Sequence, residues 1–380
     1  MLSRRAFLGA SASSGTLTLL GVGAFTADDD GARELPGIVP FVGEGDPVFG
    51  ELTDSGLAAR RVLDLSRLTP DELVTRNARF FVRTGPPERL PRAADWRIWI
   101  RDRAGTAAAL PVDRLRALAR PMGAHLLECS GNGPHRRFGL LSAARWTGVP
   151  VLEALALMGL APGDHRVLVS GFDEHNAPDP RSLAGASWVF SVRDLAATGA
   201  FLALGMNGVP LPREHGTPVR LIVPGWYACA CIKWVDEIAL VPDDAPATGQ
   251  MREFARRTHQ LGVPELARDY LPARIDPAAL PVRVERRNVG TGQAFRVVGI
   301  VWGGARPVHG LTIRFAPDVG SVLVEDHQPA NPQTWSLWSH AWRPPQPGRY
   351  TIRLQVDDPG VRTRRLDRGF YDRTVELETI

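Results

Sequence analysis

Residues 125–132 read His125-Leu126-Leu127-Glu128-Cys129-Ser130-Gly131-Asn132, and the prediction of the fold starts from this stretch. An apolar run of strand-like length ends at Cys129 and gives way to a glycine-containing loop. A thiol at the end of a strand can face a ligand, and soft thiolates bind redox metals well. An ordinary buried thiol fits these residues equally well. Cys129 is therefore either a metal ligand or a packed side chain, and other parts of the sequence must distinguish the two.

The N-terminal segment has the features of an export signal. It reads Ser3-Arg4-Arg5-Ala6-Phe7-Leu8, followed by an uncharged stretch that continues to residue 26. Paired arginines ahead of a mildly apolar segment are typical of twin-arginine signal peptides. The segment is too polar for a membrane span, which needs about 20 strongly apolar residues. We predict a signal peptide over residues 1–27, a periplasmic or otherwise exported protein, and no membrane span in the mature chain.

Composition excludes several classes of function. The net charge of +4 comes with no basic run interleaved with aromatic residues, so nucleic-acid binding is not expected. The three cysteines do not form a disulfide scaffold, because Cys229 and Cys231 lie two apart in a predicted strand, where a disulfide would be strained. The sequence contains no C-x-x-C-H motif, so we expect no c-type haem in this chain.

Two domains are expected, because the chain that follows the signal is too long for one ordinary core. Residues 28–245 begin with an extended arm and then mix short strands and helices irregularly, which predicts an α+β domain. Residues 246–280 are rich in proline and carry one basic helix, as in a linker. Residues 281–380 contain short alternating runs between Gly, Pro and Asp turns, which predicts an all-β sandwich of immunoglobulin type.

Three further segments carry polar groups that could share a site with Cys129. Residues 204–212 predict a hairpin with an Asn-Gly turn. His215 lies just before a predicted strand, and Arg220 lies within it. Lys233 is the only lysine in a chain whose other basic positions are arginine, which indicates a site that needs a compact ammonium group. Cationic side chains around a thiolate would suit an anionic, phosphate-bearing cofactor.

Taken in order, these segments resemble the sulfite oxidase family of molybdopterin enzymes. The family pattern is Cys-Ala-Gly-Asn, Trp-x-Gly, Met-Asn-Gly-x-Pro-Leu-Pro, His-Gly-x-Pro-x-Arg, Val-Pro-Gly-Trp and Lys-Trp. The resemblance extends from about residue 80 into the C-terminal region, where residues 299–304 are similar to the start of the family's dimerisation domain. The matching residues of this chain are Cys129–Asn132, Trp146–Gly148, Met206–Pro212, His215–Arg220, Val223–Trp226 and Lys233-Trp234.

The resemblance implies a sulfite-oxidase-type molybdopterin-binding domain followed by an immunoglobulin-like dimerisation domain, with one molybdenum-molybdopterin per chain. Cys129 would be the protein ligand to molybdenum and a catalytic residue. Arg83, in a strand predicted over residues 79–83, would contact the cofactor and lie beside the anionic substrate, also as a catalytic residue. The pterin phosphate would be held by His215, Arg220 and Lys233, with help from backbone groups of Cys231 and Ile232.

By the same resemblance, the chain would oxidise sulfite or a related sulfur compound by oxygen-atom transfer. It would pass the electrons to an external acceptor such as a c-type cytochrome, and it would form a homodimer. The sequence departs from the family at three points. Thr84-Gly85 replaces Asn-His, which would contact the pterin, while Gly133-Pro134-His135 displaces the following substrate-binding arginine and Ala184 replaces an active-site tyrosine. Two alternatives therefore stay open, a reductase of sulfoxide-type substrates and a non-catalytic binding protein that retains the fold.

Overall fold

The computed structural model describes residues 37–175, 186–289, 292–306, 308–324, 326–327 and 333–378. The chain from Gly37 onward forms one compact unit. The predicted signal peptide, residues 1–27, and Ala184 both lie outside the described residues. No helix in the described part is long and apolar enough to cross a membrane.

The strand that leads to Cys129 belongs to an antiparallel sheet of order β10-β9-β6-β5, with β11 also paired to β9. Asn207 and Gly208, between β9 and β10, have φ angles of +52° and +83°. Two left-handed residues are what a type I′ turn requires, so the predicted Asn-Gly hairpin is confirmed. The strands of this sheet are β5 (Arg120–Glu128), β6 (Leu141–Pro150), β9 (Phe201–Met206), β10 (Val209–Pro210) and β11 (Arg220–Ile222).

A second sheet has the order β4-β3-β12-β7-β8, in which only the β3–β12 pair is parallel. Short helices connect strands of this sheet to strands of the first sheet, and α3 shows why they stay short. The Ser191 side chain accepts from the Asp194 N–H at its start, and Gly199 in the left-handed conformation ends it. This mixture confirms the α+β prediction. The elements are β3 (Arg97–Arg101), β4 (Ala107–Pro111), β7 (Arg166–Gly171), β8 (Ser187–Phe190), β12 (Val235–Val241), α1 (Val112–Arg116), α2 (Val151–Leu157) and α3 (Val192–Thr198).

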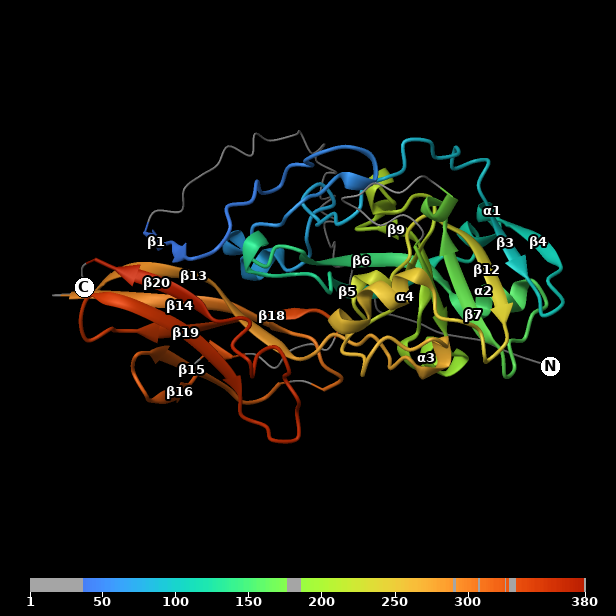
Figure 1. Cartoon of the computed structure of the whole chain (residues 1–380). Helices are drawn as coiled ribbons and strands as arrows, with labels where there is room; N and C mark the ends of the chain where they lie inside the picture. Colours follow the sequence, from blue (N-terminus) through green and yellow to red (C-terminus); the bar gives the residue numbers. More distant parts are fainter. Residues whose placement is uncertain are drawn as a thin grey trace, which may run out of the picture. The chain divides into compact units, whose positions relative to one another are not determined.

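Two more antiparallel sheets form the predicted C-terminal β-sandwich (Figure 1). Their orders are β1-β13-β14-β18-β17 and β16-β15-β19-β20-β2. The N-terminal strands β1 and β2 thus add one strand to each sheet. The strands are β1 (Ile38–Val39), β2 (Phe41–Val42), β13 (Ala278–Val289), β14 (Gly292–Trp302), β15 (Leu311–Ala316), β16 (Ser321–Leu323), β17 (Asp326–His327), β18 (Trp335–Trp342), β19 (Gly348–Val356) and β20 (Arg373–Leu377).

Gly299 in β14 lets a tryptophan pack directly on the backbone of the sandwich. A Cβ at this position would lie 2.0 Å from Cζ2 of Trp338 and 2.5 Å from the Leu280 carbonyl oxygen. The Trp338 indole donates to the Ile300 carbonyl (3.0 Å) and is buried. The space that glycine leaves is therefore filled by the largest side chain of the neighbouring strand.

Two local predictions are wrong. Residues 79–83 form no strand, and Val82 makes only an isolated bridge to Arg61. The Cys229–Cys231 segment is not a strand either, because its backbone hydrogen bonds close locally in the 3₁₀ turn η7 (Ala228–Ala230). There the Cys231 N–H donates to the Ala228 carbonyl (3.1 Å).

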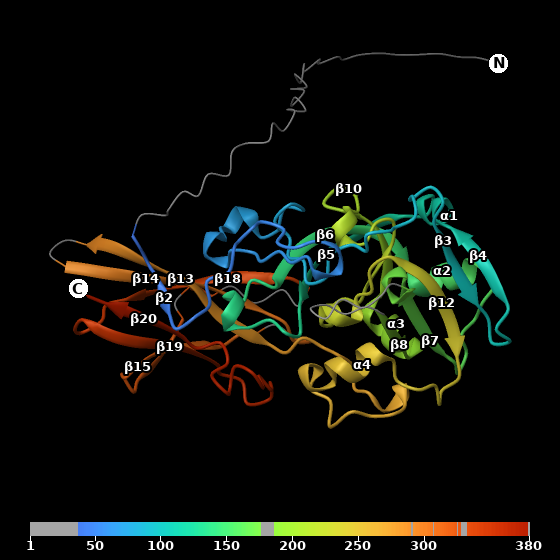
Figure 2. The same cartoon turned by 45° about the horizontal axis from the view of Figure 1, so that its top comes forward.

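The segment predicted as a linker is folded. It contains α4 (Gly249–Phe254), which begins where the Thr248 side chain accepts from the Met251 N–H. α4 contacts β8, and Figure 2 shows it in yellow beside that sheet. Met251 and Phe254 are buried on its inner face. This segment therefore forms part of the wall of the α+β region.

Candidate active site

Cys129 lies where the chain leaves the carboxyl end of β5. Its N–H donates to the Leu140 carbonyl (3.0 Å), and its own carbonyl accepts from the Asn132 N–H (2.9 Å). The Asn132 side-chain oxygen in turn accepts from the Leu140 N–H (3.1 Å). The thiol is buried, and the Gly131 N–H points at Sγ from 3.4 Å. The predicted strand followed by a tight loop is confirmed, and the loop fixes the direction of the Cys129 side chain.

The Cys129 side chain lines a cavity that is partly open to solvent. Its walls come from the Cys129 strand, residues 80–84, the turns that precede and follow β11, and α4. All seven predicted site residues meet here: Arg83, Cys129, His215, Arg220, Cys231, Ile232 and Lys233. The sequence therefore predicted their convergence, while their individual roles toward a cofactor stay predictions.

Backbone carbonyls hold the cations of one wall in place. Lys233 Nζ donates to the carbonyls of Thr84 and, at 3.0 Å, Glu214. Arg220 Nη1 donates to the His215 carbonyl (3.1 Å). Such bonds orient the ammonium and guanidinium groups without neutralising them, so their charge remains available to a ligand.

Burial dominates the pKa of each group in this wall. Burial first, and then the nearby charges of Arg220 and Lys233, lower the pKa of His215 to about 3, although a hydrogen bond with the Asn77 carbonyl partly opposes them. Burial also lowers the pKa of Arg220 to about 10 and that of Lys233 well below its usual value. Asp173 and Glu214 offset only part of the positive charge at Lys233. Desolvated positive charge is costly without an anion, so this wall is suited to bind a phosphate.

Among the described residues that line the cavity, two guanidinium groups have buried nitrogens that meet no hydrogen-bond acceptor, Arg83 Nη1 and Arg220 Nε. Buried donors are nearly always satisfied, so these two indicate a bound group that is not part of the chain. Within the described ranges, no cluster of three His, Cys, Asp or Glu side chains could hold a metal ion. The Cys129 thiol, the cationic wall and the unpaired donors fit a metal-bearing cofactor that carries a phosphate.

The Cys129 thiol experiences opposing influences. Burial and, to a smaller extent, the Glu128 charge raise its pKa above the usual thiol value, while the Gly131 N–H and the charges of Arg83 and Arg257 offset part of that rise. Metals bind the thiolate rather than the thiol. The arginines and the loop N–H thus favour the form of Cys129 that a metal requires.

The sequence did not single out three residues that the structure places at the cavity or beside Cys129. Gln250 and Phe254 of α4 line the cavity. Arg257 lies just beyond α4, and a Cβ on Gly131 would meet Arg257 Nη1 at 3.2 Å and Cys129 Sγ at 3.8 Å. The only sequence signal was the basic helix of the predicted linker, which does not show which way its arginines point.

Comparisons with known proteins agree with this geometry. The family model "Oxidoreductase molybdopterin binding domain" matches residues 85–248. The chain is 28% identical over 298 residues to mitochondrial sulfite oxidase of Macaca fascicularis, covering 71% of this chain and 53% of that protein. It is 26% identical over 302 residues to sulfite oxidase of Gallus gallus, covering 72% and 64%. The chain thus spans about half to two thirds of the length of these relatives.

A solved structure shares the fold over nearly the whole chain. The sulfane dehydrogenase SoxCD from Paracoccus pantotrophus aligns with a TM-score of 0.65 at 17% identity, covering 94% of this chain and 96% of that chain. The alignment includes the C-terminal sandwich as well as the cavity region. At this level of identity, the likeness concerns the fold alone.

Proposed function

We propose that this chain is a member of the sulfite oxidase family of molybdopterin-dependent oxidoreductases, that it binds one molybdenum-molybdopterin, and that it oxidises sulfite or a related sulfur compound. The observation that carries the proposal is the buried Cys129 thiol in a cavity whose arginines have unpaired donors. Bound there, the cofactor would supply the two-electron redox chemistry and the oxygen-atom transfer. Cys129 would hold the metal, while His215, Arg220 and Lys233 would hold the phosphate.

The residues around Cys129 favour an anionic substrate. Arg83 and Arg257 both act on the Cys129 thiol through their charge. Arg136 lies near enough to Arg83 that burial and the Arg83 charge together lower its pKa. These arginines would attract and orient a small sulfur oxyanion and exclude neutral competitors. Arg136 would take the place of the family's displaced substrate-binding arginine, because it lies close enough to Arg83 for the Arg83 charge to lower its pKa.

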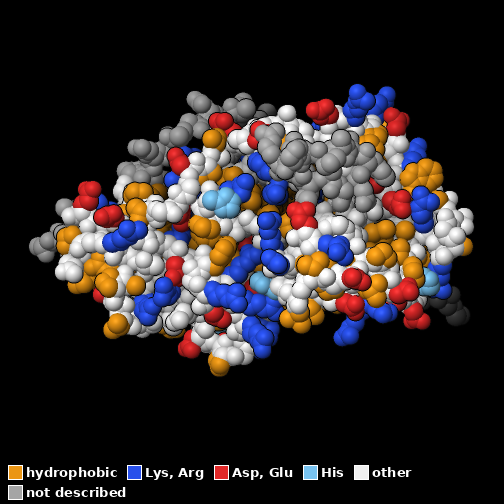
Figure 3. All heavy atoms as spheres, in the orientation of Figure 1, with side chains coloured by type: hydrophobic (Ala, Val, Ile, Leu, Met, Phe, Trp, Pro, Cys, Tyr) orange, Lys and Arg blue, Asp and Glu red, His pale blue; other side chains and the backbone are white. Residues whose placement is uncertain are grey.

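The electron acceptor is proposed to be an external, acidic partner such as a c-type cytochrome. Figure 3 shows a band of Lys and Arg side chains across the middle of the face in view. Exposed arginines at 256, 257, 362, 364 and 368 form no ion pair within the described ranges. A positive surface near the metal would speed the encounter with a negatively charged partner. Export through the twin-arginine route and a homodimer are further parts of the proposal.

The decisive experiment is Cys129→Ser, produced in a host that makes the cofactor. We expect molybdenum content and sulfite oxidation both to fall at least 100-fold, since a hydroxyl is a poor substitute for a soft thiolate. Cys229→Ser is the matched control, because this second cavity thiol has no predicted role toward the cofactor, and it should retain at least half of the activity.

Parallel assays separate the alternatives. A molybdenum-loaded protein that reduces sulfoxides and leaves sulfite unchanged would establish the reductase. A folded protein without molybdenum would establish the binding protein. Full activity in Cys129→Ser would contradict the ligand assignment itself.

A further inference from the structure

Glu128 is a fully buried carboxylate directly before Cys129, and the cavity does not use it. Successive side chains of a strand point to opposite faces. Cys129 therefore faces the cavity, whereas Glu128 faces the C-terminal sandwich. A buried carboxylate is retained only where partners compensate for its desolvation.

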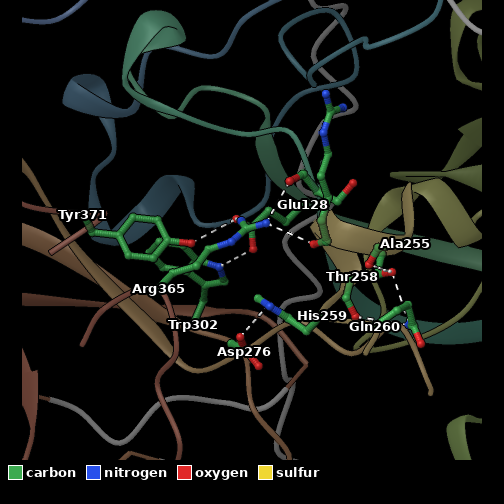
Figure 4. Close-up of polar contacts among 11 residues, drawn as sticks. Glu128, Ala255, Thr258, His259, Gln260, Asp276, Trp302, Arg365 and Tyr371 are labelled. Carbon is green, nitrogen blue, oxygen red and sulfur yellow. Dashed lines mark hydrogen bonds and ion pairs between the residues drawn. The ribbon is translucent and has the colours of Figure 1, made fainter. Parts of the chain in front are cut away.

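Three partners of Glu128 come from the sandwich sequence (Figure 4), and Asn132 of the Cys129 loop also interacts with its carboxyl group. Trp302, at the end of β14, donates from Nε1 to Oε2 at 2.9 Å. The Tyr371 hydroxyl donates to Oε1 at 3.4 Å. Arg365 Nη1 lies 3.7 Å from Oε1, a charge–charge contact longer than a hydrogen bond. The sandwich thus fixes the residue on the N-terminal side of Cys129.

Arg365 also fixes the residue on the other side. Its Nη2 donates to the Ser130 carbonyl at 2.8 Å and to the Arg257 carbonyl at 3.2 Å. The guanidinium itself is packed over the Tyr227 ring, 5.1 Å from the ring centre. One side chain of the sandwich therefore contacts both neighbours of Cys129 and the backbone of Arg257, which faces the thiol.

We propose that Arg365 is a positioning residue for the metal ligand: through Glu128 and Ser130 it sets the direction of the Cys129 Sγ, so that the sandwich forms part of the active unit. The proposal rests on the proposed function, because it takes Cys129 as the ligand. Partners behind a metal ligand orient it and tune the metal, and their loss commonly changes affinity or activity 10- to 100-fold. Arg365 has two hydrogen bonds to loop carbonyls and one ion pair with which to do so.

The test uses the loaded enzyme with Arg365→Gln and Arg365→Lys. We expect Arg365→Gln to keep its molybdenum within twofold of the parent and to shift the electron paramagnetic resonance spectrum of the partly reduced metal. The kcat for sulfite should fall about tenfold or more while KM changes less than threefold. Arg365→Lys retains the charge facing Glu128 and should recover part of both the spectrum and the kcat.

Arg353→Gln is the matched control, because Arg353 also pairs with a sandwich carboxylate, Asp372 at 2.6 Å, without contacting residues 128–130. It should keep the parent spectrum and a kcat within twofold. A parent-like spectrum and kcat in Arg365→Gln would overturn the proposal. If that variant does not fold, Glu128→Gln decides, since it keeps an oxygen acceptor for Trp302 while it removes the charge that faces Arg365 and the acceptor of the Tyr371 hydroxyl.

The failure of this inference is distinguishable from failure of the proposed function. A parent protein without molybdenum would contradict the proposed function, and so would a fully active Cys129→Ser variant. A loaded, active parent whose spectrum is unmoved in Arg365→Gln and Glu128→Gln would contradict only the role of Arg365.

Discussion

The chain's single lysine is held in a fixed position at the wall of the cavity. Lys233 Nζ is held by two backbone carbonyls and lines the cavity. If it binds the cofactor phosphate, Lys233→Ala should lower molybdenum occupancy about tenfold or more, because a hydrogen bond from a charged group contributes about 1.5–3 kcal/mol. The measurement is molybdenum per chain after purification at limiting cofactor.

The control for that variant is Arg213→Ala. Arg213 immediately precedes the Glu214–His215 segment of the wall, but its guanidinium donates to the carbonyls of Pro87 and Glu88. Arg213 is not part of the cavity lining, so occupancy should stay within twofold of the parent. Equal occupancy in the two variants would remove Lys233 from the phosphate site.

His215 should make the cofactor-free protein sensitive to acid. Its pKa in the folded state is about 3, against about 6.5 in the unfolded chain. Between these values the unfolded state binds the proton and the folded state does not, so stability falls as the pH is lowered from 6.5 toward 3. Between pH 7 and pH 5 this single group should remove about 2 kcal/mol from the free energy of unfolding.

Urea titrations of the cofactor-free protein and of His215→Gln at both pH values test this. The variant should lose about 2 kcal/mol less than the parent, because its side chain does not titrate. Other groups, including His125, whose pKa burial also lowers, titrate in both proteins and cancel in the difference. The same pH dependence in parent and variant would rule out the buried neutral imidazole.

At the scale of elements, one glycine determines how closely two strands of the sandwich pack. Gly299→Ala would place a Cβ 2.0 Å from Trp338, so the indole must move or β14 must shift. Overpacking of a core commonly costs about 1–3 kcal/mol, and a clash with an indole held by its own hydrogen bond should reach the upper end. Chemical denaturation measures the loss.

Gly320→Ala is the comparison, because a Cβ there meets nothing within 4 Å. It should change the free energy of unfolding by less than about 1 kcal/mol. If Gly299→Ala were as stable as Gly320→Ala, the close packing of Trp338 on β14 would not contribute to stability.

Sequence patterns predicted the elements well where periodicity and turn residues agree. They predicted them poorly for segments that line the cavity, such as residues 80–84, which form no strand. The Asn207-Gly208 turn was predictable because its left-handed backbone demands those residues. Residues 79–83 alternate like a strand, yet Phe80, Phe81 and Val82 are all buried. An alternating pattern shows which positions are apolar. A strand also needs a neighbouring strand to accept and donate its backbone hydrogen bonds, and the local sequence does not show whether one is present.

The site residues divide in the same way. Cys129, His215, Arg220 and Lys233 were predictable because they lie in motifs with a fixed order. Arg257 and Arg365 were not, because each acts through a contact between distant segments. Arg365 lies 235 residues from Ser130, whose carbonyl it holds. Nothing in the local sequence around either arginine indicates that contact.

At the scale of the whole molecule, a buried ion pair connects the N-terminal arm to the last strand. Arg373 of β20 donates from Nε and Nη2 to both oxygens of Glu44, at 2.7 and 2.5 Å, and both side chains are almost fully buried. Glu44→Ala would leave the guanidinium buried and unpaired. We expect it to cost about 3–5 kcal/mol, measured by urea denaturation.

Asp46→Ala provides the control two residues away. Asp46 pairs with Arg137 at 3.0 Å, but its side chain is 91% exposed. A surface pair contributes about 0–1 kcal/mol, so this variant should be nearly as stable as the parent. Equal losses in the two variants would mean that Arg373 finds another partner when Glu44 is removed.

The pairing of the arm with both sheets also sets an order of events during synthesis. Glu44 leaves the ribosome 329 residues ahead of its partner Arg373, and β2 leaves just before Glu44, far ahead of its partner strand β20. The sandwich therefore closes late, after every segment of the cavity has been made. A chain interrupted before residue 373 would present unpaired strand edges to proteases and to neighbouring chains. Only a chain synthesised through β20 can pair the strand β2 and the buried Glu44 carboxylate with their partners.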